Sequence, residues 1–136
     1  MQFDHERLDV YHAALDFLVH AERLIGALPR GRRHLADQLG RASLSIVNNI
    51  AEGAGKTSPA DKRRYYTTAR GSATESPCGD FPGSSAALLD VYLRLELASE
   101  DDHRSGKQML FRIVSMLVKL TPSGVTKRVA RSQENR

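Results

Sequence analysis

A chain of 136 residues with 40% hydrophobic and 26% charged residues is long enough for one soluble domain with a buried core. It has no apolar run of the roughly 18–20 residues that a membrane helix needs, and its charged N-terminus is unlike a secretory signal. The single cysteine, Cys78, cannot form an internal disulfide, which fits a reducing compartment. We therefore expect a cytoplasmic protein without a membrane partner.

The charges are unevenly distributed along a chain of net charge +4. Residues 30–72 carry nine bases and three acids, whereas residues 73–102 carry seven acids and one base. Such segregation predicts a basic face. It equally predicts that acidic and basic helices pair, either inside one bundle or between subunits, and charge alone does not choose between these outcomes.

The first helix is predicted from residue 8 to residue 28, where apolar residues recur at helical spacing. Asp9 and Asp16 lie nearer its start and Arg23 nearer its end, as the helix dipole favours. Pro29 and Gly31 then end it.

A second helix is predicted from Arg33 to Glu52, and "GAGKTS" follows it. These six residues look like the end of a phosphate-binding loop, but Ile50 stands where that motif requires glycine. The segment in front of them also has the pattern of a helix rather than of a buried strand. We interpret the stretch as a helix end and a new helix start, so no nucleotide cofactor is expected.

This interpretation assigns a role to each residue of the junction. Gly53 is predicted to be a C-cap residue with positive φ, which glycine adopts without strain. Ser58 is predicted to be the N-cap of the third helix, with Pro59 at its first position and Asp61 completing a capping box.

The third helix is predicted to turn Tyr65, Tyr66 and two alanines inward. Residues 76–85 hold two prolines and two glycines, which no α-helix tolerates. Helical spacing resumes at Ala86, and "SEDD" at residues 99–102 is predicted to cap the last helix.

The fold class predicted from these elements is all-α. Short connections between long amphipathic helices favour an up-and-down four-helix bundle over residues 1–121, whose third helix is interrupted by the Pro/Gly-rich inserted loop 76–85. The basic tail 122–136 has no apolar face, so we expect it to be disordered.

Motifs for catalysis or metal binding are not found. The five histidines do not have the spacing of metal ligands, no nucleophile motif occurs, and no evident base accompanies Cys78. We expect a non-enzymatic protein without metal or cofactor. Asn49 on the apolar face of the second helix, and Glu52 at its end, favour a polar clamp at the helix junction, with Arg41 or Lys56 or free N–H groups of the third helix as partners for Glu52.

Three stretches of the chain resemble a known family. "FDHERLDVYHAAL", "QLGRASLSIVNNIAEGAGKTSPADKRRYY" and "ARGSATE" are similar to the four-helix-bundle proteins encoded in intervening sequences of bacterial 23S ribosomal RNA genes. The resemblance covers residues from about 3 to 120. The motif residues, which we interpret as defining fold and assembly, are Arg41, Ser45, Asn49, Glu52, Gly53, Gly55, Gly71, Ser72 and Glu75.

The resemblance implies a small cytoplasmic bundle that assembles as a homo-oligomeric ring, often a pentamer. Related proteins are accessory factors of diversity-generating retroelements, where they bind a reverse transcriptase and nucleic acid. In the family the helix that carries the last motif usually continues without a break. The insertion 76–85 departs from that pattern and puts in question any subunit interface built on this helix.

Two functions of different classes remain. The first is a nucleic-acid-binding accessory protein that contacts RNA or DNA phosphates through a basic surface. The second is a structural or protein-interaction module whose charges pair with neighbouring subunits or partners. The residues predicted to bind nucleic acid are Arg30, Arg32, Arg33, Lys56, Lys62, Arg63, Arg64 and Arg70.

Overall fold

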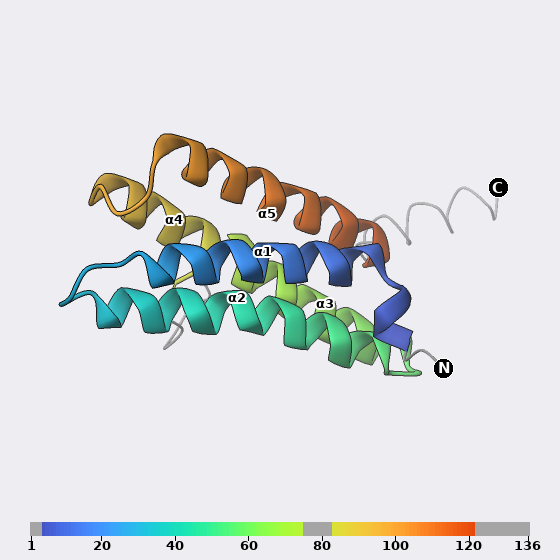
Figure 1. The fold of residues 1–136 in the computed structure, drawn as a ribbon. Helices are drawn as coiled ribbons and strands as arrows, with labels where there is room; N and C mark the ends of the chain where they lie inside the picture. Colours follow the sequence, from blue (N-terminus) through green and yellow to red (C-terminus); the bar gives the residue numbers. More distant parts are fainter. Residues whose placement is uncertain (1–3, 75–82, 122–136) are drawn as a thin grey trace.

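A computed structural model describes residues 4–74 and 83–121, and within these ranges the chain is all-helical, without strands (Figure 1). Its elements are the 3₁₀ helix η1 Asp4–Arg7 and the α-helices α1 Asp9–Gly26, α2 Arg33–Ala54, α3 Pro59–Thr74, α4 Ser85–Arg94 and α5 Glu100–Leu120. The predicted fold class, all-α, is confirmed for these residues.

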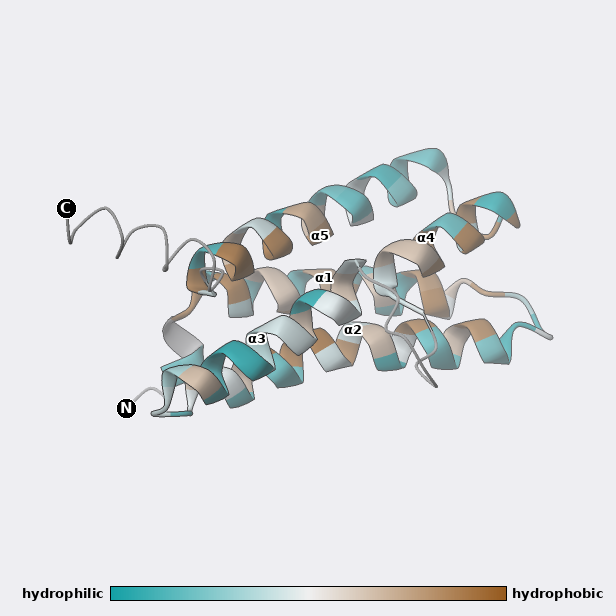
Figure 2. Cartoon of the chain, turned by 180° about the vertical axis from the view of Figure 1, so that it is seen from behind, coloured by the Kyte–Doolittle hydropathy of each residue, from teal (hydrophilic) through white to brown (hydrophobic). Residues whose placement is uncertain are grey.

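The helices pack lengthwise around one core. α1 packs against α2 and α5, and α3 and α4 each contact both α2 and α5. Figure 1 shows α1 and α2 side by side and joined at one end, while the turn between α2 and α3 lies at the opposite end. Polar residues dominate α3 and the first half of α5, as Figure 2 shows, and apolar residues recur on the helices around the core.

Every α-helix contributes buried side chains to this core. Phe17 of α1, Ile46 of α2, Tyr92 of α4 and Ile113 of α5 are completely inaccessible to solvent. The hydroxyl of Tyr92 donates a 2.9 Å hydrogen bond to the carbonyl of Leu35, which ties α4 to the first turn of α2. Burial raises the pKa of Tyr92 to about 12, so the hydroxyl keeps its proton and remains a donor.

The starts of α3 and α5 follow the predicted capping chemistry. Ser99 is the N-cap of α5, where its hydroxyl accepts a 3.1 Å hydrogen bond from the N–H of Asp102. Ser84 caps α4 in the same way. Pro59 begins α3 as predicted, and the N–H of Asp61 donates to the Ser58 hydroxyl over 3.4 Å. The structural interpretation of "GAGKTS" as a junction between two helices is therefore confirmed.

The predicted role of Gly53 is wrong. α2 continues through Gly53 to Ala54, and its C-cap is Gly55, whose φ is −81° rather than positive. Gly53 is instead buried against α3: a Cβ on it would lie 2.7 Å from Cε1 of Tyr66. A glycine is needed there because an aromatic ring occupies the space of a side chain.

Other boundaries shift by one or two residues. α1 ends at Gly26 rather than at residue 28, because Ala27 already serves as its C-cap. Ser85 belongs to α4 rather than to the inserted loop, because the Ser84 cap starts that helix. Residues 76–82 of the predicted loop, with Cys78 among them, lie outside the described residues, as do Glu75 and the tail 122–136.

Candidate nucleic-acid interface

Three of the predicted binding residues form an arginine turn, Arg30, Arg32 and Arg33, between α1 and α2. Arg30 and Arg33 are exposed and Arg32 is half-buried. No ion pair joins any of the three to an acid within the described part of the chain. Their positive charge is therefore not neutralised by this chain's own described carboxylates.

The position of the arginine turn adds to its positive potential. Arg32 is the N-cap of α2 without a side-chain cap, and no acid lies in the first turn of that helix. The N-terminus of a helix carries the positive end of the dipole and N–H groups without helical partners. Cations are unfavourable there, so an anion such as a phosphate would relieve the repulsion.

A second group surrounds Tyr65 at the other end of α2. Lys56 and Arg64 lie over the Tyr65 ring, with Nζ and Cζ at 5.3 and 5.0 Å from its centroid. We call these three residues and Lys62 the tyrosine corner, a label unrelated to the β-sandwich motif of that name. They come from the α2–α3 connection and the first turns of α3. Cation–π contacts at such exposed sites contribute about 0.5–1 kcal/mol each.

The cations of the tyrosine corner are partly engaged already. Lys62 donates from Nζ to the carbonyls of Gly53 and Ala54, over 3.2 and 3.0 Å. These bonds give hydrogen-bond partners to carbonyl groups at the C-terminal end of α2. Lys56, one of the partners considered for Glu52 from the sequence, lies 3.9 Å from it. Arg64 pairs with Asp61 at 3.9 Å. The positive charges of the tyrosine corner are therefore compensated more fully than those of the arginine turn.

Arg63 and Arg70 lie on the outer side of α3, seven residues apart and hence on one helix face. Arg63 is exposed and has no ion pair to an acid of the described residues. Arg70 is half-buried and has an interaction within the protein. Arg63 is therefore better placed than Arg70 to contact a phosphate.

The eight predicted binding residues do not form one patch. The arginine turn lies at the start of α2 and the tyrosine corner just beyond its end, at opposite ends of the bundle in Figure 1. A helix of this length separates them by roughly 30 Å at 1.5 Å per residue. The predicted binding residues thus include two separate basic sites, the arginine turn and the tyrosine corner, rather than one continuous basic face.

The motif residues of the second and third helices form a polar contact between α2 and α3. The hydroxyls of Ser45 and Ser72 are 2.9 Å apart, and Asn49 donates from Nδ2 to the Ser45 carbonyl over 2.8 Å. Ser72 is buried and Asn49 half-buried. The polar contact between the two helices is made by Ser45 and Ser72, whereas Asn49 bonds within α2 and the exposed Glu52 pairs with Lys56. The clamp expected from Asn49 and Glu52 at the helix junction is therefore not seen as a direct contact of these two residues with α3.

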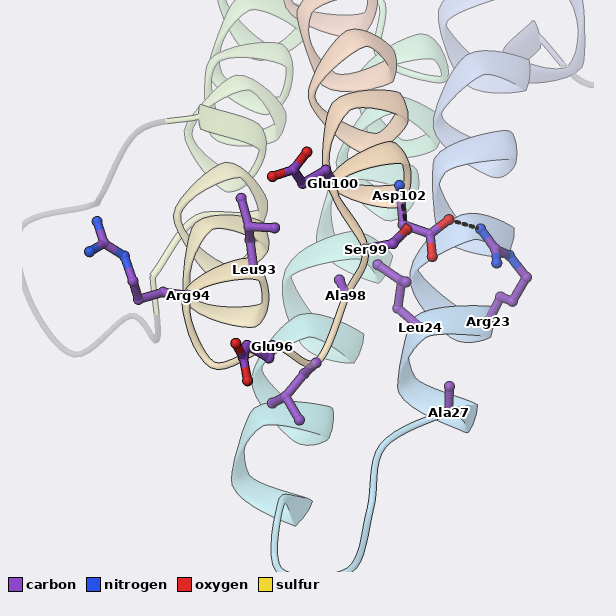
Figure 3. A pocket seen from close by; sticks show the side chains of 11 residues that line it. Arg23, Leu24, Ala27, Leu93, Arg94, Glu96, Ala98, Ser99, Glu100 and Asp102 are labelled. Atoms are coloured by element: carbon purple, nitrogen blue, oxygen red, sulfur yellow. Dashed lines mark hydrogen bonds and ion pairs between the residues drawn. The ribbon is translucent and has the colours of Figure 1, made fainter.

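A hollow of 770 Å³ lies between α1 and the connection from α4 to α5 (Figure 3). Its wall carries both signs of charge: Arg23 donates to the Asp102 carboxylate over 2.7 Å, and Glu96 and Glu100 are close by. The hydrogen bond from Arg23 lowers the pKa of Asp102 below its usual value. The lining carries two cations, Arg23 and Arg94, and three acids, so the hollow has no net preference for an anion.

No group of three or more potential metal ligands occurs among residues 4–74 and 83–121. None of the helices formed by these residues has the length and apolar character to span a bilayer.

The structure and its motif contacts define a class of protein. It is a small all-helical protein in which two serine side chains join α2 to α3, while an asparagine of α2 bonds to one of those serines. The chain belongs to the 23S rRNA-intervening sequence protein family, whose family model matches residues 6–119. The resemblance deduced from the sequence motifs is thereby confirmed. Comparison with curated proteins finds none that matches the chain.

Proposed function

We propose that this protein is a non-enzymatic, cytoplasmic, homo-oligomeric helical bundle that binds RNA or DNA through phosphate contacts. The proposal extends to the architecture: α3 and α4 act as two parts of one interrupted helix, the third of a four-helix bundle. Their shared contacts with α2 and α5 support this arrangement. Residues 76–82 would then join the two parts.

The observation that carries the functional proposal is the arginine turn. Its three cations lie at a helix N-terminus without an acid partner among the described residues. Phosphate contacts of this kind require no base reading, so the expected binding is strong at low salt and nearly independent of sequence. Assembly into an oligomer would repeat the turn and add avidity to a weak single contact.

The test is fluorescence anisotropy with labelled structured RNA and duplex DNA over a series of salt concentrations. Replacing Arg30, Arg32 and Arg33 together by Gln should reduce the salt slope by about two to three units, because each lost phosphate contact contributes roughly 0.7–0.9. The matched control replaces three other exposed cations, Arg94, Arg112 and Lys119, by Gln and should leave most of the slope intact. Absence of wild-type binding at about 50 mM salt would refute the proposal.

The second candidate is a protein-interaction module, and a different observation favours it. The cations of the tyrosine corner are engaged by Glu52, Asp61 and backbone carbonyls, while Phe111 on α5 is 74% exposed. An exposed aromatic side chain is typical of a protein contact. A reverse transcriptase, which the family resemblance suggests as a partner, would be tested by co-sedimentation with this chain in the absence of nucleic acid.

A further inference from the structure

Two large apolar side chains are far more exposed than any other among the described residues. Val19 on α1 is 70% exposed and Phe111 on α5 is 74% exposed. Neither belongs to the rows of apolar residues that its helix turns toward the core of the protein. Each costs solvation free energy in the isolated chain, at roughly 25 cal/mol per Å² of apolar surface.

Acidic residues flank Val19, and the nearby cation Arg23, four residues after it on α1, is already ion-paired with Asp102 at 2.7 Å. Asp16 and Glu22 lie three residues before and after it, on the same exposed face of α1. No ion pair or hydrogen bond joins either carboxylate to another of the described residues. This acidic face therefore has an apolar centre and two carboxylates whose charge is not neutralised within the described part of the chain.

The surroundings of Phe111 are basic. Arg104 and Lys107 precede it by seven and four residues, on the same face of α5. All three line a groove of 620 Å³ whose floor includes Leu110 and Val114. This basic groove has an apolar centre flanked by cations, the counterpart of the face around Val19.

The cations of the groove are held only by exposed contacts within the chain. Arg104 lies 3.3 Å from Asp101, and Lys107 lies 2.9 Å from Asp90. Ion pairs at this exposure contribute little to stability, because water screens the charges. A carboxylate arriving with a partner can therefore share or replace these contacts at little cost.

We propose that the acidic face around Val19 of one copy docks on the basic groove around Phe111 of a second copy. The occupant follows from charge complementarity, since one chain carries both an acidic and a basic surface, each with an exposed apolar centre. Such a contact joins two different surfaces and is heterologous, so its repetition builds a closed ring or an open chain. The inference rests on the self-association that forms part of the proposed function.

The test is sedimentation velocity at micromolar concentration on the full chain and on charge-reversed variants. Asp16→Lys with Glu22→Lys should raise the apparent dissociation constant of assembly by roughly tenfold or more, because like charges then face each other. Arg104→Glu with Lys107→Glu should do the same. All four substitutions in one chain restore opposite charges and should recover most of the assembly.

An uncharged variant keeps the test valid if a charge reversal perturbs folding. Phe111→Ser should weaken assembly by about tenfold or more while leaving the helical circular dichroism unchanged, since the side chain is exposed. The matched control is Leu44→Ser on α2, which removes another exposed apolar side chain, 46% exposed, from outside both surfaces.

The outcomes separate this inference from the proposed function. An oligomer that all these variants leave unchanged would overturn the inference alone. A wild-type chain that sediments only as a 15.0 kDa species would overturn it together with the proposed self-association. Loss of assembly in both pairs without recovery in the fourfold variant would show that the two surfaces do not meet. Nucleic-acid binding is measured separately and decides only the other part of the proposed function.

Discussion

Tyr66 packs its ring against the place where Gly53 would carry a side chain. A Cβ there would lie 2.7 Å from Cε1 and 2.9 Å from Cδ1 of the ring, closer than real Cβ atoms come. Tyr66 is only 4% exposed, so its ring cannot swing into solvent without opening the α2–α3 contact. The close approach of these two helices therefore depends on one missing side chain.

Gly53→Ala should lower the free energy of unfolding. Overpacking costs about 1–3 kcal/mol, which exceeds the gain in helix propensity of at most about 1 kcal/mol. Urea denaturation at a fixed protein concentration measures the change. The control is Gly71→Ala within α3, where a Cβ meets nothing within 4 Å and which should stabilise by about 0.5–1 kcal/mol. Equal effects at the two positions would contradict the steric argument.

Asp90 links α4 to α5 through two contacts. Its carboxylate lies 2.7 Å from Nε2 of His103 and 2.9 Å from Nζ of Lys107. The hydrogen bond from His103, followed by that from Lys107, lowers the pKa of Asp90 below its ordinary value of 3.8. A carboxyl whose folded pKa is depressed adds stability above its unfolded pKa, and this is lost as the pH falls through the folded pKa.

Asp90→Asn should therefore destabilise the protein at pH 7 and have little effect once the pH is well below 3.8. The effect should be small, since the Asp90 side chain is 59% exposed and solvent screens it. Urea unfolding at neutral and at acidic pH measures the difference. Asp37→Asn, at an exposed position of α2 without an ion pair to the described residues, serves as the matched control. An equal loss at both pH values would argue against the linkage.

At the scale of elements, the junction of α2 and α3 depends on Lys62. Its ammonium group binds the last carbonyls of α2 from the first turn of the next helix. Lys62→Met keeps the aliphatic stem and removes these bonds, so it should cost about 0.5–1 kcal/mol of stability. It should hardly change the salt slope of nucleic-acid binding, because the charge already serves the helix end.

Arg63→Gln is the matched comparison on the same helix. Arg63 is exposed and has no ion pair within the described residues, so its loss should change stability by no more than about 0.5 kcal/mol. If the exposed face of α3 contacts phosphate through Arg63, the substitution should lower the salt slope by roughly 0.7–0.9. A large slope change for Lys62→Met and none for Arg63→Gln would reverse this assignment.

The insertion between α3 and α4 gives a second prediction at this scale. The prolines and glycines between α3 and the Ser84 cap of α4 predict an exposed loop, and the basic tail 122–136 is predicted to lack structure. Limited proteolysis followed by mass spectrometry should find the first cuts in these two segments. Amide-exchange protection across 76–82 equal to that of the helices would contradict the loop.

At the scale of the whole molecule, the separation of the two basic sites sets a length requirement. The arginine turn and the tyrosine corner are roughly 30 Å apart, which corresponds to about nine base pairs of duplex at 3.4 Å each. A duplex of about six base pairs can engage only one site of a given chain. Its salt slope should therefore be clearly smaller than that of a duplex of about twenty base pairs.

Anisotropy titrations with the two duplexes measure this difference, and the arginine-turn variant supplies the control. In that variant the long duplex should show a slope close to that of the short one, because one site is lost. Identical slopes for the two duplexes on the wild-type chain would indicate that a single site carries the binding.

The sequence by itself determined the helical class, the family and most helix ends of this protein. Apolar spacing, Pro59 and the serine caps act locally, within one turn of a helix, so they can be deduced from neighbouring residues alone. The family motif was recognisable for the same reason: "SIVNNIAEG" is contiguous in the chain. The positions of Val19 and Phe111 outside the apolar rows were also visible, although their large exposure was not deduced from them.

The tertiary structure decided what depends on residues far apart in the chain. Gly53 could not be assigned correctly from its neighbours, because the ring that excludes a side chain belongs to Tyr66 on another helix. The basic residues of 30–72 looked like one group, yet α2 is straight and long enough to place them at opposite ends. Whether Lys62 was a binding residue or a helix cap likewise depended on which carbonyls lay within reach of its ammonium group. Distances between helices arise from packing, which local sequence patterns do not encode.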